Sequence, residues 1–132
     1  MPIDYEAEYN NRARVPEHPA IFARWTREAE DYRAESMKQR RAELGLSYGS
    51  SPPQFIDLFS PGRGSAAPLA VFVHGGYWQE LGRRESAFAA PGFLRRGCAF
   101  AAVGYGLAPA HGVAEMVGMV VRMRSRSWNV RP

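Results

Sequence analysis

The chain has 132 residues, of which 45% are hydrophobic, 12% aromatic and 23% charged. This length and apolar fraction suffice for one globular domain with a hydrophobic core, and they exclude an intrinsically disordered chain. The formal net charge is +4, and four arginines with no acidic residue among them follow Val121. The basic excess therefore indicates a tail rather than a nucleic-acid-binding face, and we expect no nucleic-acid partner.

Membrane and disulfide classes are excluded by simple features of the sequence. No run approaches the roughly 20 apolar residues that a spanning helix needs, and the first residues lack the pattern of a signal peptide. The single cysteine, Cys98, cannot form an internal disulfide. We expect a cytoplasmic protein without a membrane partner.

The first predicted element is a long helix, or a broken pair of helices, from residue 19 to about residue 44. Its apolar residues recur near the helical period and are Ile21, Phe22, Trp25, Ala29 and Tyr32. Gly45 is the expected stop. The basic run at residues 38–41 is expected to be solvated.

Turn residues at 48–53 then lead to a predicted strand at residues 54–59. An uninterrupted apolar run at residues 68–73 is typical of a strand covered on both faces of a parallel sheet. A helix at residues 86–96, ended by Gly97, separates it from a second such strand at residues 99–103. This order predicts a right-handed parallel α/β unit.

The last predicted element is a helix with one apolar face. That face consists of Val113, Met116, Val117, Val120 and Val121. The pattern ends after about Met123, where an arginine-rich segment begins. We therefore divide the chain into residues 1–123, part of a single domain, and a divergent basic tail at residues 124–132.

The motif with the clearest chemistry follows the strand at residues 68–73. His74-Gly75-Gly76 leaves backbone amides at the carboxyl end of a parallel strand, where ligands bind in open α/β sheets. Paired glycines let the backbone approach a substrate oxygen, and fixed amides stabilise the charge that builds on a carbonyl oxygen during acyl transfer. An ordinary glycine turn between strand and helix is the alternative that this tripeptide leaves open.

A longer stretch carries a family resemblance. Residues 71–79, Val-Phe-Val-His-Gly-Gly-Tyr-Trp-Gln, resemble the oxyanion-loop signature of esterase- and lipase-type α/β-hydrolases, in the form typical of the kynurenine formamidase (arylformamidase) branch. Residues 103–109, Val-Gly-Tyr-Gly-Leu-Ala-Pro, resemble the next turn of that group, and Tyr9-Asn10-Asn11-Arg12 resembles its N-terminal region. The resemblance runs from about Asp4 to Val121.

The resemblance implies an incomplete α/β-hydrolase fold, namely the N-terminal strands of a mostly parallel sheet with flanking helices. It implies that the amides of Gly75, Gly76 and Tyr77 form the oxyanion hole, with His74 a structural member of the loop and Trp78 packing nearby. The implied substrate is a small-molecule ester or aryl-formamide, attacked by an activated serine, and no metal or organic cofactor is implied.

The catalytic serine, acid and histidine are expected to be missing from these 132 residues. By resemblance, the serine lies in a Gly-x-Ser-x-Gly elbow on the strand after the helix begun at Val113, and we expect no such elbow anywhere in this sequence. His18 and His111 are expected to be surface or turn residues. We therefore expect a truncated chain that is inactive alone, cut by a frameshift or premature stop, the alternative being an ordinary basic C-terminus.

A non-enzymatic function is a further interpretation of the sequence. The exposed edge of a half-sheet could pair with another copy of the chain or with a separate C-terminal half. A binding or assembly module, or one half of a split hydrolase, is therefore the alternative to an inactive hydrolase.

Overall fold

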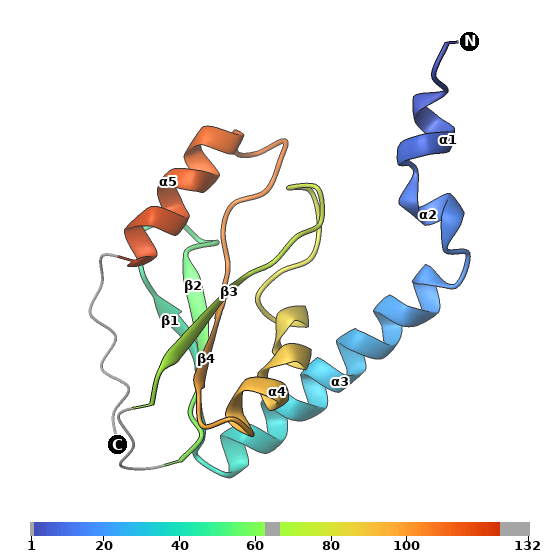
Figure 1. The fold of residues 1–132 in the computed structure, drawn as a ribbon. Coiled ribbons are helices and arrows are strands. Elements are labelled where there is room, and N and C mark those ends of the chain that lie inside the picture. The colour runs from blue at the N-terminus through green and yellow to red at the C-terminus, as the bar shows by residue number, and fades with distance from the viewer. Residues whose placement is uncertain (1, 63–66, 125–132) are drawn as a thin grey trace.

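The computed structural model describes residues 2–62 and 67–124, which form a mixed α/β fold (Figure 1). The strands are β1 (Ala42–Ser47), β2 (Phe55–Phe59), β3 (Leu69–Val73) and β4 (Ala99–Val103). The helices are α1 (Tyr5–Tyr9), α2 (Asn11–Arg14), α3 (His18–Lys38), the 3-10 helix η1 (Glu85–Ala89), α4 (Ala90–Leu94) and α5 (Val113–Arg124). The predicted α/β class is confirmed.

The four strands form one sheet in the order β1-β2-β4-β3. β3 and β4 pair in parallel, and β2 is antiparallel to both of its neighbours. Three of the four strands therefore run in the same direction. The predicted parallel unit of strand, helix and strand is confirmed by β3, the η1–α4 segment and β4.

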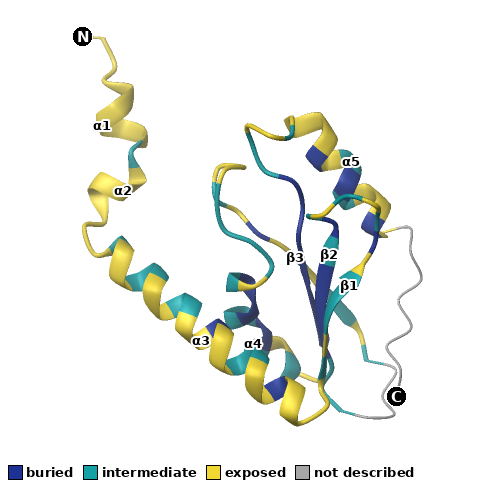
Figure 2. Cartoon of the chain, turned by 180° about the vertical axis from the view of Figure 1, so that it is seen from behind, coloured by how far each residue is buried: buried dark blue, intermediate teal, exposed yellow. Residues whose placement is uncertain are grey.

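Helices cover the two faces of the sheet and create two core layers (Figure 2). Alternate residues of β4 serve the two layers: Ala101 and Val103 pack with α5, whereas Phe100 and Ala102 pack with α3 and the η1–α4 segment. All five residues of β4 are buried. The continuous apolar run at residues 99–103 thus has the double-sided burial that it predicts.

The long N-terminal helix ends earlier than its sequence indicates. α3 stops at Lys38, and residues 42–47 form β1 instead of continuing the helix to residue 44. Gly45 is therefore not a helix stop: it lies in β1 with a φ of 71°, where the register with β2 shifts. Pairing with β2 supplies backbone hydrogen bonds that override the helix propensity of this segment. The basic run at residues 38–41 is exposed, as predicted.

The predicted helix at residues 86–96 is shorter and mixed in type. It begins as the 3-10 helix η1 and becomes α-helical at Ala90, with Pro91 in the first turn of α4. Proline lacks an N–H and therefore starts a new helical turn more easily than it continues one. Phe88 points inward and stacks on Trp25 of α3, with ring centroids 5.0 Å apart.

The apolar face of the last helix differs from the predicted one. α5 buries three methionines, and its valines lie mostly on the outer side. The buried residues are Met116, Met119 and Met123, and the exposed ones are Val113, Val117 and Val121. Both sets have helical spacing, so packing against the sheet decides between them. The predicted tail at residues 124–132 lies outside the described residues, except for Arg124 at the end of α5.

β3 is less covered than its sequence predicts. It lies at one edge of the sheet and pairs only with β4 among the described strands. Val71 is 46% exposed and Val73 is 45% exposed, on the face that α5 covers only in part. The expectation of burial on both faces is therefore wrong for β3. Among the described helices, none is both long and apolar enough to cross a membrane.

Asp57 of β2 is the polar centre of the fold. Its carboxylate is fully buried and forms ion pairs with Arg33 of α3 and with Arg83, whose Nε lies 3.1 Å from Oδ1. The same Oδ1 accepts a hydrogen bond of 2.9 Å from the amide of Gly45. One side chain thus joins α3, the bulge in β1 and the segment before η1.

We predict that Asp57→Ala lowers the free energy of unfolding by about 3 kcal/mol or more, because it leaves two arginines and a backbone amide without their shared acceptor. Urea denaturation followed by circular dichroism measures this. Asp31→Ala, at an exposed position of α3, is the matched control and should change stability by less than about 0.5 kcal/mol. Equal stabilities of the two variants would contradict a structural role for the Asp57 network.

Candidate functional site

The motif from His74 to Trp78 follows β3 directly and lies beside the turn that follows β4. Because β3 and β4 are parallel neighbours, their carboxyl ends meet at one edge of the sheet. The ring of Tyr105 stacks on the imidazole of His74 at 4.4 Å, with 14° between the planes. The Tyr105 hydroxyl donates a 2.7 Å hydrogen bond to the carbonyl oxygen of His74. The two segments singled out in the sequence thus form one unit.

Gly76 is the glycine that the backbone of this loop requires. Its φ is 117°, and a Cβ built on it would lie 2.2 Å from the carbonyl oxygen of Glu80. Gly75 differs, because a Cβ there would meet nothing within 4 Å and its φ is not in the left-handed region. The loop therefore depends sterically on the second glycine of the pair.

A left-handed turn follows Gly76. Tyr77 and Trp78 have φ values of 51° and 59°, which non-glycine residues seldom adopt. The turn is closed by hydrogen bonds from the amides of Gln79 and Glu80 to the carbonyl oxygen of Gly76. The amide of Ala108 donates to the carbonyl of Trp78 at 2.7 Å, which ties the turn to the segment after β4.

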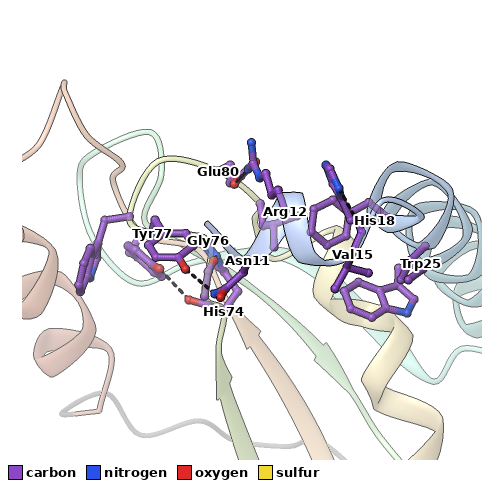
Figure 3. A pocket seen from close by; sticks show the side chains of 15 residues that line it. Asn11, Arg12, Val15, His18, Trp25, His74, Gly76, Tyr77 and Glu80 are labelled. Atoms are coloured by element: carbon purple, nitrogen blue, oxygen red, sulfur yellow. Dashed lines mark hydrogen bonds and ion pairs between the residues drawn. The ribbon is translucent and has the colours of Figure 1, made fainter. Parts of the chain in front are cut away.

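The backbone amides of Gly75, Gly76 and Tyr77 are unused in the described part of the chain. No described acceptor bonds to any of the three N–H groups. These residues line a cavity of about 630 Å³ between the loop, α2 and α3 (Figure 3). Unpaired donors at the wall of a cavity are available to a ligand oxygen.

His74 is buried within the loop. Its Nδ1 lies 2.8 Å from the carbonyl oxygen of Gly75 and must carry the proton to donate there. Burial lowers the pKa of His74, and the contact with the Gly75 carbonyl and the charge of Glu85 oppose this only in part. Its Nε2 is buried without a partner among the described residues. The ring packs within the loop and does not extend into solvent as a free base would.

The N-terminal helices supply cavity residues that sequence patterns did not single out as site residues. The wall opposite the loop is formed by Asn11, Arg12, Val15, His18, Ile21, Phe22 and Trp25. His18, which was expected to be a surface or turn residue, is half-buried and lines the cavity. The helical period accounts for Phe22 and Trp25 only as core positions. These two residues also line the cavity because α3 runs beside the loop.

One Gly-x-Ser-x-Gly pattern does occur in the chain, at residues 45–49, and the structure shows that it is not a nucleophile elbow. Such an elbow joins a strand to a helix, whereas this pattern joins β1 to β2. Ser47 Oγ donates to the carbonyl of Gly49 at 2.7 Å. β1 is separated from β3 by two strands, or about 14 Å at the usual strand spacing. Ser47 therefore cannot attack a carbonyl held by the loop.

A metal site finds no support in the described residues. Within residues 2–62 and 67–124, no three histidine, cysteine or acidic side chains come together as ligands would. His111 lies with its Nδ1 3.0 Å from Glu115 Oε1, far along the chain from the other histidines. The chemistry available at the site is therefore that of the backbone amides and of the cavity wall.

Comparisons with known proteins point to one group of hydrolases. The chain is 38% identical over 80 residues to a kynurenine formamidase of Salmo salar and 43% identical over 65 residues to one of Drosophila melanogaster, covering 60% and 48% of this chain. It spans only 27% and 21% of those two proteins. No protein-family profile matches the chain.

Two solved structures share the fold of this chain over most of its length. A Silicibacter protein assigned as a thioesterase superposes with a TM-score of 0.80 and 33% identity, over 92% of this chain and 45% of its own. Esterase B of Lactobacillus rhamnosis superposes with a TM-score of 0.57 at 20% identity, over 82% of this chain and 38% of its own. The second likeness concerns the fold alone.

We predict that Gly76→Ala destabilises the chain by about 1–3 kcal/mol, because the new Cβ meets the Glu80 carbonyl and the φ becomes strained. Gly75→Ala is the matched control and should cost less than about 0.5 kcal/mol of folding free energy, since its Cβ enters open space. Thermal unfolding of the two variants compares them directly. If both glycines tolerate alanine equally, the loop geometry described above is wrong.

We also predict that the chain loses stability as the pH falls below about 6.5, the ordinary pKa of histidine. The folded state holds His74 neutral while the unfolded state takes up a proton, so acid favours unfolding. Urea denaturation between pH 7.5 and pH 5.5 should show the loss, and His74→Phe should reduce it. An NMR titration in which His74 protonates at or above pH 6.5 would refute the prediction.

Proposed function

We propose that this chain, which is similar to the N-terminal portion of the kynurenine formamidases and esterase-like α/β-hydrolases, supplies the oxyanion-stabilising part of a hydrolytic acyl-transfer site. One observation carries the proposal: the unused amides of Gly75, Gly76 and Tyr77 line one cavity. Amides fixed by a strained turn and by the His74–Tyr105 contact need no rearrangement to receive a developing negative charge.

The reaction that fits this arrangement is hydrolysis of an ester or an aryl-formamide. A nucleophile attacks the carbonyl carbon, the carbonyl oxygen takes up the negative charge, and the three amides donate hydrogen bonds to it. Loss of one such donor typically costs on the order of 100-fold in rate. The proposal involves no metal and no organic cofactor.

The cavity favours a small molecule with an apolar part. Aromatic rings of Phe22, Trp25 and Trp78 line it, together with Ile21 and Leu81. Such walls bury planar or aliphatic groups, while the amides orient the reacting carbonyl. We propose the cytoplasm as the site of action, a setting compatible with the free thiol of Cys98.

The 132 residues alone are proposed to be catalytically inactive. Ser47 lies in β1, with β2 and β4 between it and β3, and the buried ring of His74 is committed to its own loop. We propose that the nucleophile and its base come from polypeptide outside the residues that the structure describes.

A second candidate function, assembly with another polypeptide, is favoured by one face of the structure. The exposed valines of β3 and α5 border a groove of about 280 Å³, lined by residues that include Val73, Met116 and Val121. Unpaired strand edges and apolar faces are where additional chain packs. Another copy of the chain, or a separate segment that carries the nucleophile, would fit this face.

We predict that the purified 132-residue chain hydrolyses neither p-nitrophenyl acetate nor N-formylkynurenine above the rate in buffer, because Ser47, the serine of its Gly-x-Ser-x-Gly pattern, lies in β1 with β2 and β4 between it and β3. A fluorophosphonate probe should leave the chain unlabelled, as judged by intact mass. The Ser47→Ala variant is the control for adventitious labelling. Stoichiometric labelling that disappears in this variant would show that Ser47 is a nucleophile after all.

The same assay tests the oxyanion role when the nucleophile is supplied. Co-expression with the part of the Silicibacter protein that this chain does not match should restore esterase turnover if the two halves assemble. Gly76→Ala in this chain, which displaces the loop amides without removing them, should then lower the rate by up to about 100-fold, and Gly75→Ala by much less. Turnover that is indifferent to Gly76 would refute the oxyanion role, while absence of assembly would refute the split-enzyme alternative.

A further inference from the structure

The N-terminal helix α2 contacts both ends of the turn that follows Gly76. Asn11 Nδ2 donates a 2.7 Å hydrogen bond to the hydroxyl of Tyr77, at the start of the turn. The guanidinium of Arg12 forms an ion pair with the carboxylate of Glu80, at its end. Figure 3 shows Asn11 close to Tyr77 and Arg12 close to Glu80, among the residues that line the cavity. The contacts join residues 66 and 68 positions apart in the sequence.

The turn between these two contacts is one that the backbone does not favour. Tyr77 and Trp78 both have left-handed φ values, and amides that donate to the Gly76 carbonyl close the turn. A conformation of this kind persists when its surroundings hold it. Tyr105 supports the loop from the sheet side through its hydrogen bond to His74. On the solvent side, Asn11 and Arg12 are the support.

α2 can act as a support because α3 fixes its place. α1 and α2 lie beyond the end of α3 and away from the sheet (Figure 1). The connection is short: the amide of Val15 bonds to the carbonyl of Arg12, and the amide of His18 bonds to the carbonyl of Val15. α3 is itself held to the body by the stacking of Trp25 on Phe88 and by the ion pair of Arg33 with Asp57. The position of α2 relative to the loop is thereby set.

We infer that Asn11 and Arg12 are positioning residues, which hold Tyr77 and Glu80 and thereby fix the backbone amides of Gly75, Gly76 and Tyr77 toward the cavity. This rests on the proposed function of those amides. It also assigns a role to Asn11 and Arg12 in the segment Tyr9-Asn10-Asn11-Arg12. Neither residue touches the reacting atoms. Each acts through a side chain of the loop.

α2 also contains an arginine that does not contact the loop and can serve as the control. Arg14 lies on the same short helix, but it bonds to the carbonyl of Ala7 and to Glu8 in α1 and not to the loop. Arg14→Met therefore removes an arginine from α2 and leaves both loop contacts in place. Asn11→Ala combined with Arg12→Met removes both loop contacts. The two variants separate loop positioning from general support of the N-terminal helices.

Amide hydrogen exchange measured by NMR on the 132-residue chain tests the inference. The informative amides are those of Glu80 and Ala108, whose acceptors are the carbonyls of Gly76 and Trp78. In the Asn11→Ala/Arg12→Met variant, we expect both to exchange roughly fivefold faster or more, as the loss of hydrogen bonds to the turn implies. The amide of Gly104, bonded to the carbonyl of Phe55, is the reference for the sheet and should not change. Arg14→Met should leave all three within about twofold of the unmodified chain.

Two further variants keep the test decisive if the double variant loses its fold. Tyr77→Phe removes only the hydroxyl that accepts from Asn11, so it should accelerate exchange as Asn11→Ala does, and the two changes together should add nothing. Exchanging the charges, with Arg12→Glu and Glu80→Arg combined, should restore slow exchange relative to Arg12→Glu alone. Unchanged exchange at Glu80 and Ala108 in Tyr77→Phe, or no rescue by the charge exchange, would overturn the inference. Exchange rates do not depend on hydrolysis, so a failure of the proposed function would leave this result standing.

Discussion

The buried carboxylate of Asp57 is the constraint on which the rest of the structure depends. It lies in the middle of the sheet with no exposure to solvent, and three donors from three different elements meet there. A buried charge is tolerated only when its partners satisfy it, so Arg33, Arg83 and the Gly45 amide must all approach the sheet. In doing so they set the position of α3, the bulge of β1 and the path of the chain toward η1.

The geometry of the candidate site follows from that arrangement. α3, held at Asp57 and by its stacking on Phe88, brings Phe22 and Trp25 to one side of the cavity. The loop after β3 forms the other side, supported by Tyr105 from beneath and by α2 from the solvent side. Only Gly76 among its glycines is sterically obligatory, because the Glu80 carbonyl occupies the place of a Cβ. Rigid elements thus hold a strained turn, and residues of that turn line one cavity.

β3 and α5 together present an exposed apolar face. Val71, Val73 and the outer valines of α5 leave apolar surface beside the same loop that carries the amides. The chain spans less than half of the solved structures that it resembles, and about a quarter of the formamidases. The loop after β3 therefore lies next to this exposed apolar surface.

Sequence by itself determined the class of fold and the place of the loop. The runs at residues 69–73 and 99–103 indicate two strands of a sheet packed against helices, and a glycine pair after the first marks the edge where open α/β sheets bind ligands. Tertiary structure decided what depends on distant partners. Residues 42–47 form β1 because β2 supplies partners for their backbone hydrogen bonds. Both faces of α5 are apolar enough to pack, and packing against the sheet places the methionines inward. Asn11 and Arg12 contact residues of the loop that lie 66 and 68 positions further along the chain. No local sequence pattern indicates contacts over such separations.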